Sequence, residues 1–317
     1  MNFDTIVIRK EFKQNEYRTP LVPTDVSILV SNNFNVFIEN FSNRCFLLEE
    51  YIANGAKEIN QAEIYELNKD HTLIIGLKDL DIKDIIYFKF NHLYFSHTYK
   101  NQIDSYQILN MFKCNGGKIY DLEYLTDTNN NRLVYFGNHA GFIGAILGIC
   151  QYIYRNDKKT LTNLKPILDI NNELLNLKNM LTLQLNKPNI AIIGPNGKCG
   201  KGAIDLLNLF ELQYSKFERT DSKLNLSNYN IIINCIFLNK NDEISPFIDN
   251  NSMSNFKNCV IVDVSCDYSN KNNPIRIYDK LTSHENPVAH INSEIDLIVE
   301  ESKQSAAEAY ADYLSDR

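Results

Sequence analysis

The sequence predicts an α/β protein with two domains, each built on a parallel β-sheet covered by helices. Short apolar runs typical of buried strands alternate with segments whose apolar residues recur at helical spacing. This alternation occurs twice, in residues 5–125 and again in residues 190–265, on either side of a long apolar segment. A glycine-rich loop opens the second series. The two sheets are expected to flank an interdomain cleft.

The first series contains five expected strands, at residues 5–9, 34–39, 72–77, 92–96 and 117–125. Helical spacing between them is illustrated by Val26, Leu29 and Val30, and by Leu48, Tyr51 and Ile52. Continuous apolar strands interleaved with amphipathic helices are typical of a parallel sheet that is buried on both faces. The first part of the chain is therefore predicted to be one α/β domain.

A nearly continuous run of apolar and small residues at 138–156 predicts a buried helix between the domains, about 28 Å long. The second series has expected strands at 190–194, 211–218, 229–238 and 259–265. Ile295, Val299 and Tyr313 share one face of a predicted final helix. We predict a substrate-binding, catalytic domain of residues 1–137 plus 290–317, and a dinucleotide-binding domain of residues 138–289.

Composition excludes several classes of function. The net charge of −7 and the scattered 32 basic residues argue against nucleic-acid binding, so a small-molecule substrate is expected. No apolar run is long enough to cross a membrane, and the amino terminus lacks an apolar leader. Seven cysteines without a CxxC pair or a close histidine predict neither disulfides nor a metal site. We expect a cytoplasmic protein, as a monomer or a small homo-oligomer.

The loop "IAIIGPNGKCGKGAIDLL" places Gly194, Gly197 and Gly200 between an apolar strand and a helix. Glycines in this context let a pyrophosphate approach the helix amino terminus, so the loop predicts a Rossmann-like NAD site. Glu218 follows the next strand, where an acidic residue binds the adenosine ribose and repels a 2′-phosphate. The adjacent Arg219 leaves NADP open. The alternative is an ordinary turn between a strand and a helix.

Further cofactor contacts are expected in the loop and at the ends of the following strands. The candidates are Lys198, Cys199, Cys235, Asp263, Ser265 and Asp267. Strand ends beside the glycine loop face the nicotinamide side of a bound dinucleotide. Packing behind the loop is the alternative for Cys199, and loop capping is the alternative for the two aspartates and the serine.

Several motifs resemble a known family in order and spacing. "RKEFKQNEYRTPLVP" resembles the amino-terminal domain shared by alanine dehydrogenase, the NAD-binding part of transhydrogenase and the lysine-forming saccharopine dehydrogenases. "IIGLKDL", "YFSHTYKNQ", "RLVYFGNHAGFIGAILG", "INCIFL" and "VDVSCDYSNKNNPI" resemble the saccharopine dehydrogenase branch more closely. The resemblance extends from about residue 5 to residue 278, and it implies an NAD-dependent enzyme with two Rossmann-like domains.

The resemblance implies a specific reaction. Saccharopine is oxidised by NAD at its secondary amine, and hydrolysis of the imine yields lysine and 2-oxoglutarate. In these steps the amine loses a proton, water adds to the imine carbon, and lysine leaves protonated. Each step needs an acid or base whose pKa lies near the working pH. The family's lysine and histidine fall on Lys78, which would take the proton of the amine, and on His97, which would assist the addition of water. Without the resemblance, Lys78 is a solvated strand-end residue and His97 a core histidine.

The resemblance also implies residues that bind substrate or tune the two bases. Arg18 matches an arginine that binds a substrate carboxylate, and Arg132 matches another near the cofactor and substrate. Lys100 is a further candidate for anion binding. Asp79 and Glu123 are neighbouring carboxylates that moderate the pKa values of the bases. Taken alone, Arg18 is a surface ion-pair residue and Glu123 a hairpin charge.

The resemblance weakens after residue 280. Asn292 aligns with a family aspartate at the cofactor, although a shift of a few residues would bring Glu294 or Asp296 there. Three functions therefore remain open. They are a saccharopine dehydrogenase, a related NAD(P)-dependent enzyme acting on another amine and keto acid, and a non-catalytic dinucleotide-binding protein.

Overall fold

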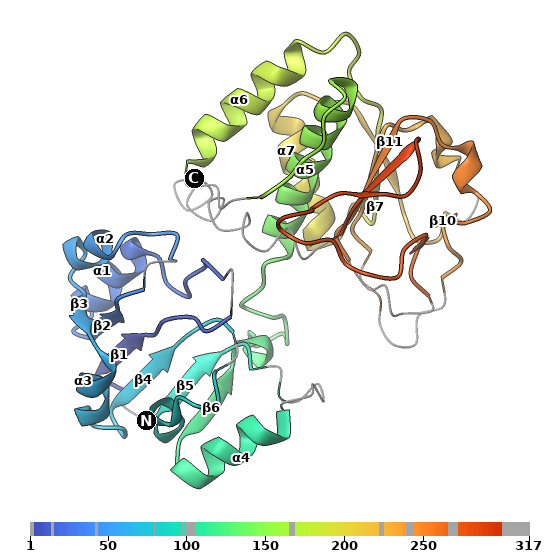
Figure 1. Cartoon of the computed structure of the whole chain (residues 1–317). Helices are drawn as coiled ribbons and strands as arrows, with labels where there is room; N and C mark the ends of the chain where they lie inside the picture. Colours follow the sequence, from blue (N-terminus) through green and yellow to red (C-terminus); the bar gives the residue numbers. More distant parts are fainter. Residues whose placement is uncertain are drawn as a thin grey trace. The chain divides into compact units, whose positions relative to one another are not determined.

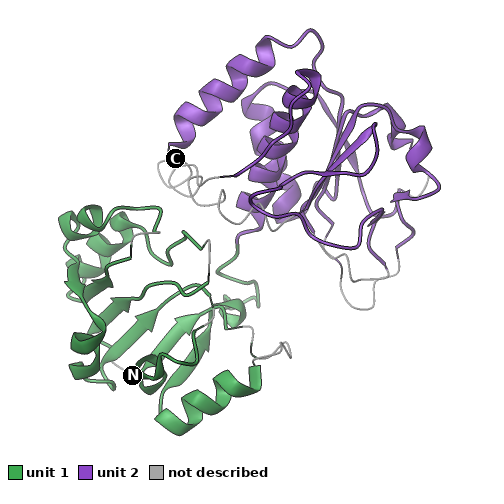
Figure 2. Cartoon of the chain, in the orientation of Figure 1, with its two compact units in different colours: residues 1–135 green, residues 136–317 purple. Residues whose placement is uncertain are grey.

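The chain divides into two compact units, residues 1–135 and residues 136–317 (Figures 1 and 2). The structure is a computed structural model. It describes residues 3–13, 16–41, 44–78, 80–96, 98, 105–164, 169–221, 225–236, 238, 244–265 and 272–299.

The first unit contains a six-stranded, wholly parallel sheet. Its strands are β1 (Thr5–Ile8), β2 (Asn35–Glu39), β3 (Lys57–Ile59), β4 (Thr72–Ile75), β5 (Asn91–Tyr94) and β6 (Lys118–Asp121). Their order across the sheet is β3-β2-β1-β4-β5-β6. This is the order of a doubly wound Rossmann sheet, with its topological switch point between β1 and β4.

Helices connect these strands, and both faces of the sheet are buried. The helical segments are α1 (Pro23–Ser31), α2 (Leu48–Ala53), α3 (Gln61–Glu66), η1 (Ile85–Lys89), α4 (Ser105–Asn115) and η3 (Leu122–Tyr124). Consecutive residues of β1 enter different apolar clusters, Val7 with Phe112 of α4 and Ile8 with Val26 of α1. Apolar side chains are required on both faces, so polar groups lie mainly at the strand ends.

The second unit has its own six-stranded sheet, in the order β13-β14-β11-β9-β7-β8. The strands are β7 (Ile190–Ile193), β8 (Tyr214–Phe217), β9 (Ile231–Asn234), β11 (Cys259–Asp263), β13 (Ala289–His290) and β14 (Ile295–Val299). All pairs are parallel except β13 with β14. A separate pair joins β10 (Ile248–Asp249) to β12 (Ile275–Arg276). The switch point here lies between β7 and β9.

Close helix packing supports the second sheet. Its helical segments are α5 (Gly137–Asn156), α6 (Ile170–Thr182), α7 (Lys198–Leu209), η4 (Leu226–Asn228) and η5 (Met253–Asn255). A Cβ atom on Gly141 of α5 would lie 1.8 Å from the carbonyl oxygen of Cys199, and one on Gly202 of α7 would lie 1.8 Å from that of Asn138. The backbones of α5 and α7 therefore touch, which fixes the start of α7 against the sheet.

The two parallel α/β sheets confirm the predicted fold class. The predicted final helix is wrong at its start, because Ile295–Val299 is strand β14. All five of its residues are buried and pair with Cys259–Asp263 of β11. Residues 290–299 consequently belong to the second unit, and the boundary between the units falls after residue 135. Residues 300–317 lie outside the described part. No helix among the described residues could cross a membrane.

His92 is a fully buried titratable residue in the first sheet. Its imidazole lies on β5, edge-on to the rings of Tyr87, Tyr94 and Phe112. Burial lowers the pKa of His92 well below its usual value, and the nearby Arg9 cation lowers it further. The folded protein therefore holds His92 neutral, whereas the unfolded chain takes up a proton below about pH 6.5.

We predict that His92 makes stability fall with acidification. Because the unfolded state binds the extra proton, the free energy of unfolding should decrease below about pH 6.5, by up to about 1.4 kcal/mol for each pH unit. Urea unfolding at several pH values would measure the slope. His92→Phe should flatten it. Equal slopes in native protein and His92→Phe would contradict the assignment.

Candidate active site

The glycine loop of the second unit connects β7 to α7 at the switch point. Gly194 has φ +80°, a conformation that side chains disfavour, and its N–H donates to the carbonyl oxygen of Phe217 at 2.8 Å. A Cβ atom on Gly194 would lie 3.1 Å from the backbone of Cys235 and Ile236. Glycine is therefore needed both for the turn and for the close passage of the chain that leaves β9.

Gly200 and Gly197 have different surroundings. A Cβ atom on Gly200 would lie 2.2 Å from the carbonyl oxygen of Gly194, so glycine here lets α7 approach the strand end. Gly197 precedes the first residue of α7, and the nearest atom to an added Cβ would be the Gly194 oxygen at 3.7 Å. The helix amino terminus thus has open space at Gly197. Backbone N–H groups and the helix dipole favour an anion at such a position.

Glu218 lies directly after β8 and beside the glycine loop. Its carboxylate accepts a hydrogen bond from the side-chain amide of Asn196, a loop residue. Its backbone N–H donates to Asp221 at 2.8 Å, which closes the turn after the strand. The structure therefore places Glu218 beside the loop. Asn196 was not among the sequence candidates.

The two cysteines predicted at the cofactor contact each other. Cys199, on the first turn of α7, has its Sγ atom 2.9 Å from Sγ of Cys235, and both are free thiols. Cys235 is buried after β9, while Cys199 is half-buried. Both side chains pack behind the loop, which is the packing alternative that the sequence left open for Cys199.

Asp263, at the end of β11, is fully buried within the second unit. Its carboxylate accepts hydrogen bonds from Asn234 Nδ2 at 2.9 Å and from Tyr278 Oη at 2.5 Å. Ser265 donates its backbone N–H to Asp263 at 3.1 Å. These contacts join the ends of β9 and β11, so Asp263 fixes the strand ends in the described structure. Asp267 lies outside the described residues.

Polar side chains of the first unit gather beyond the carboxyl ends of its strands. Arg9 and Glu11 follow β1, Lys78 follows β4, and Ser96 follows β5. Asp121 is the last residue of β6. Carboxyl ends of parallel strands share one edge of a sheet, and ligands of doubly wound sheets bind there near the switch point. The switch point between β1 and β4 is where Lys78 lies.

Lys78 is held through its backbone. The carboxylate of Glu11 accepts the N–H groups of Leu77 at 2.8 Å and of Lys78 at 3.0 Å. Arg9 donates to the carbonyl oxygen of Lys78. Burial raises the pKa of Glu11 above its usual value, although the Arg9 cation and the two backbone N–H groups oppose this rise. Lys78 itself is half-buried.

Three predicted residues, Asp79, His97 and Lys100, lie outside the described residues. The immediate neighbours of positions 79 and 97 are described, and those on each side of position 97 are tightly held. The Oγ atom of Ser96 donates to Asp121 at 2.8 Å and lies 2.9 Å from the hydroxyl oxygen of Thr98. A buried hydrogen-bond chain therefore anchors the backbone on both sides of position 97.

Two predicted substrate-binding residues form an ion pair. Arg132 Nη1 lies 3.1 Å from Glu123 Oε1, and the arginine side chain is 40% exposed. The guanidinium group also lies over the ring of Phe95, at 6.0 Å from its centroid. Glu123 follows β6, so this pair extends the polar edge at the carboxyl ends of the strands.

Arg18 forms a bidentate ion pair with Glu16. Its Nε and Nη2 atoms each lie 2.7 Å from a carboxylate oxygen of Glu16, and both side chains are buried. The alternative for Arg18 taken alone, a surface ion pair, is therefore wrong in its burial, because the pair lies inside the unit. Glu16 fixes the orientation of the guanidinium group and engages one edge of it in the geometry that a carboxylate ligand would use.

Asn292 lies at the amino end of strand β14, whereas the glycine loop of the second unit lies at the carboxyl end of β7. Its side-chain oxygen accepts the N–H groups of Glu294 and Ile295 at the amino end of β14. The glycine loop follows the carboxyl end of β7, so the position of Asn292 contradicts the predicted cofactor contact. Asp296 is the second residue of β14, and Glu294 directly precedes this strand, so both also lie at its amino end. The residues after the carboxyl end of β14 lie outside the described part.

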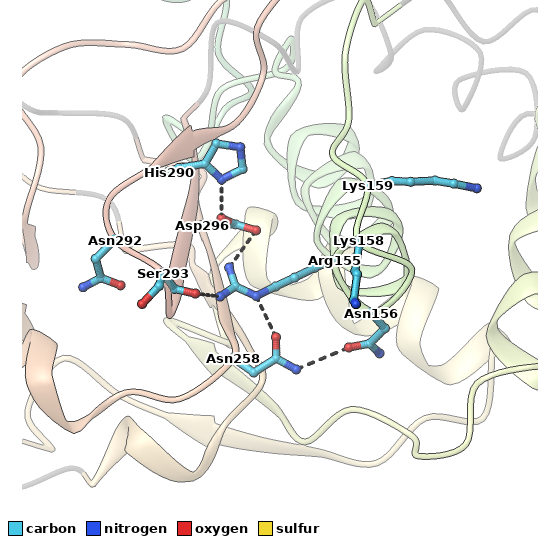
Figure 3. A pocket seen from close by; sticks show the side chains of 9 residues that line it. All are labelled: Arg155, Asn156, Lys158, Lys159, Asn258, His290, Asn292, Ser293 and Asp296. Carbon is cyan, nitrogen blue, oxygen red and sulfur yellow. Dashed lines mark hydrogen bonds and ion pairs between the residues drawn. The ribbon is translucent and has the colours of Figure 1, made fainter.

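A pocket of about 700 Å³ lies at the amino end of β14 (Figure 3). Asp296 lies 2.8 Å from Arg155 Nη1 and 2.6 Å from His290 Nδ1, and Gln151 donates to it at 2.7 Å. Arg155 also donates to Asn258 and to the carbonyl oxygen of Ser293. These groups bind one another, so the cluster connects α5 to the sheet.

Sequence reasoning assigned no role to four charged residues of the first unit's edge: Arg9, Glu11, Glu16 and Asp121. The signal that could have found them is position. Each lies at or soon after the end of an apolar strand, or within the "RKEFKQNEYR" segment. Buried charged side chains are rare unless paired. Arg9 pairs with Glu11 and Glu16 with Arg18 inside that segment, but the contacts of Glu11 with Lys78 and of Asp121 with Ser96 join distant segments and are not visible in one sequence.

Two doubly wound units, one with a glycine loop and an acidic residue beside it, define a dinucleotide-dependent dehydrogenase architecture. Two solved structures share this fold. An L-alanine dehydrogenase matches 98% of this chain and 88% of its own, with a TM-score of 0.65 and 14% identity. A transhydrogenase from Sinorhizobium meliloti matches 98% of this chain and 93% of its own, with a TM-score of 0.64 and 14% identity.

The particular family follows from sequence comparison. Residues 7–143 match the model of the alanine dehydrogenase/PNT amino-terminal domain. The saccharopine dehydrogenase [NAD(+), L-lysine-forming] of Candida glabrata is 32% identical over 91% of this chain and 82% of the relative. The enzyme of the same name from Schizosaccharomyces pombe is 31% identical over 90% of this chain and 81% of the relative. The chain belongs to the saccharopine dehydrogenase family, which confirms the resemblance and makes it an NAD-dependent oxidoreductase by class.

The glycine loop yields a prediction about stability. Gly200→Ala should lower the melting temperature, because the new methyl group overlaps the Gly194 carbonyl oxygen and overpacking typically costs about 1–3 kcal/mol. Gly197→Ala is the matched control, since its methyl group meets no protein atom closer than 3.7 Å. Thermal unfolding followed by circular dichroism measures both. Equal melting temperatures for the two variants would contradict the packing role of Gly200.

Proposed function

We propose that this chain is an NAD-dependent saccharopine dehydrogenase, which oxidises saccharopine to L-lysine and 2-oxoglutarate and also catalyses the reverse condensation. The observation that carries the proposal is the similarity to enzymes of that name along about nine tenths of the chain. The position of Lys78 at the switch point of the first sheet supports it.

The reaction consumes one water molecule and releases one proton. The C–H bond beside the secondary amine would break, and its hydrogen would leave as a hydride, for which NAD would be the acceptor. Loss of the amine proton leaves an imine. Water adds to the imine carbon, and the carbinolamine C–N bond then breaks to give lysine and 2-oxoglutarate. Each step except the hydride transfer needs a group that holds or delivers a proton.

Lys78 and His97 are proposed for these proton transfers. Lys78 would accept the proton of the substrate amine, and His97 would take a proton from water and later assist collapse of the carbinolamine. Glu11 and Arg9 hold the backbone of Lys78, while Ser96 and Thr98 anchor the chain on either side of position 97. Firmly held segments suit groups that must meet a substrate atom within hydrogen-bonding distance.

Substrate carboxylates are proposed to bind at arginines of the same unit. Glu16 holds Arg18, and Glu123 pairs with Arg132, so both guanidinium groups have defined orientations. A planar guanidinium group suits carboxylate recognition. Lys100 is a further candidate for a carboxylate, and Asp79 for tuning the bases. Both remain proposals from the resemblance.

The residues of the second unit fit a dinucleotide. NAD would supply the hydride acceptor. Gly197 leaves open space at the amino terminus of α7, where the pyrophosphate would bind, and Lys198 begins that helix. Glu218 lies beside the loop, which supports its proposed contact with the adenosine ribose. Ser265, which follows the end of β11, and Asp267 remain candidates for the nicotinamide side.

The activity predicts lysine-dependent oxidation of NADH. Purified protein should oxidise NADH, measured at 340 nm, when L-lysine and 2-oxoglutarate are both present, and saccharopine should appear by mass spectrometry. If the protein turns over another amine and keto-acid pair but not lysine with 2-oxoglutarate, the substrate is a compound related to saccharopine and the proposal is wrong. Absence of turnover on every pair tested, in protein that binds NADH, would favour a non-catalytic role.

Variants of the two bases serve as controls within this test. Lys78→Met and His97→Gln should each lower kcat by about 100-fold or more, the usual contribution of acid–base catalysis. NADH binding, measured by fluorescence titration, should stay close to native. Native rates in either variant would refute the role proposed for that residue.

Glu218 should determine the choice between NAD and NADP. Glu218→Gln removes the negative charge that repels a 2′-phosphate, so kcat/KM for NADPH should rise relative to that for NADH. Glu211→Gln removes a similar exposed charge before β8 and is the matched control. Steady-state rates with both coenzymes measure the ratio. An unchanged ratio in Glu218→Gln would move ribose recognition elsewhere.

A further inference from the structure

A buried ion pair lies at the point where β1 and β4 end. Arg9 Nη1 lies 3.3 Å from Glu11 Oε2, and the two side chains are 0% and 3% exposed. The same Arg9 atom donates to the carbonyl oxygen of Lys10 at 2.8 Å. Buried charges persist when they are paired and hydrogen-bonded, so both side chains are confined to this arrangement.

The pair binds one short segment of backbone from two sides. Glu11 accepts the consecutive N–H groups of Leu77 and Lys78, and Arg9 donates to the Lys78 carbonyl oxygen. β1 ends at Ile8 and β4 at Ile75, so these contacts lie beyond the sheet ladder. Side chains of the segment that follows β1 therefore bind the backbone at Lys78, as a neighbouring strand would.

Gly76 is part of the same arrangement. A Cβ atom on Gly76 would lie 2.3 Å from Cζ and 2.4 Å from Nε of Arg9. The guanidinium group thus occupies the space that a side chain at residue 76 would need. An alanine there would displace Arg9, whose ion pair with Glu11 leaves it little freedom to move. The glycine in "IIGLKDL" is explained by this contact.

We propose that Arg9 and Glu11 are positioning residues for Lys78, and that Gly76 provides the space for their clamp on its backbone. The inference rests on the proposed function, in which the Lys78 amine moves a proton. The clamp fixes both the N–H and the carbonyl group of residue 78, which sets where its side chain starts and points. A shift of the catalytic atom by about 1 Å can reduce a rate roughly 100-fold.

Two variants test the clamp in the intact protein. Glu11→Gln removes the carboxylate that accepts both N–H groups, while Gly76→Ala keeps both charges and displaces Arg9. Thr72→Val is the matched control. It removes a buried hydroxyl that donates to Asn68 at 2.8 Å, on the same strand but at the opposite end from Lys78. Circular dichroism and NADH titration first establish that each variant is folded.

The expected result is a loss of kcat of about 10- to 100-fold in Glu11→Gln and Gly76→Ala, with native KM for NADH and a displaced pH profile of kcat. The pH dependence of Lys78 acetylation by acetic anhydride, followed by peptide mass spectrometry, should also change without any need for turnover. Thr72→Val should match native protein in both measurements. Each clamp variant should add little to the loss in a Lys78→Met background, because the clamp acts through Lys78.

Different failures have different meanings. If Lys78→Met turns over like native protein, the proposed role of Lys78 fails. If Lys78→Met is impaired while folded Glu11→Gln or Gly76→Ala keeps the native rate, pH profile and Lys78 acetylation, the clamp alone is overturned. An equal additional loss in the Lys78→Met background would also overturn it, since the pair would then stabilise the fold and not act through Lys78.

Discussion

Both sheets are buried on both faces, and this constraint organises the whole molecule. Apolar side chains must fill the strands, as they do in β1 and β7, so polar chemistry is confined to the ends of the strands. Parallel pairing then brings the carboxyl ends of the parallel strands to one edge of each sheet. In the first unit that edge carries Arg9, Lys78 and Asp121, from three strands that are distant in sequence.

The same constraint produces different surfaces in the two units. In the second unit, glycines follow β7 and leave the start of α7 open to an anion, while Gly141 and Gly202 let α5 and α7 touch. The first unit ends β1 and β4 with a buried ion pair that holds Lys78. One edge is suited to a pyrophosphate and the other to positioned acid–base groups. This division matches a reaction in which one unit holds the coenzyme and the other the substrate.

The sequence predicted what depends on local pattern. Continuous apolar runs identified most strands of both sheets, and the motifs identified the family. The final helix was mispredicted because the apolar residues of "IDLIV" fit helical spacing as well as a strand. In the structure this segment is a strand because it pairs with β11. Asn292 was assigned to the cofactor from its alignment with a family aspartate, where the resemblance is weak. It precedes β14 and therefore lies at the amino end of that strand.

Contacts between distant side chains and backbone could not be predicted. Glu11 and Lys78 are 67 residues apart, and nothing in either segment shows that the carboxylate accepts two backbone N–H groups there. The packing of Cys199 against Cys235 and the pairing of Asp263 with Tyr278 are of the same kind. These contacts depend on the order of the strands, which a single sequence leaves open.

The most direct test of this account is a crystal structure of the protein with NAD and saccharopine bound. The account predicts saccharopine at the carboxyl edge of the first sheet, with its secondary amine about 2.6–3.2 Å from Lys78 Nζ or linked to it by one water molecule. It also predicts the pyrophosphate at Gly197. Saccharopine bound at another edge, or an amine out of reach of both Lys78 and His97, would contradict it.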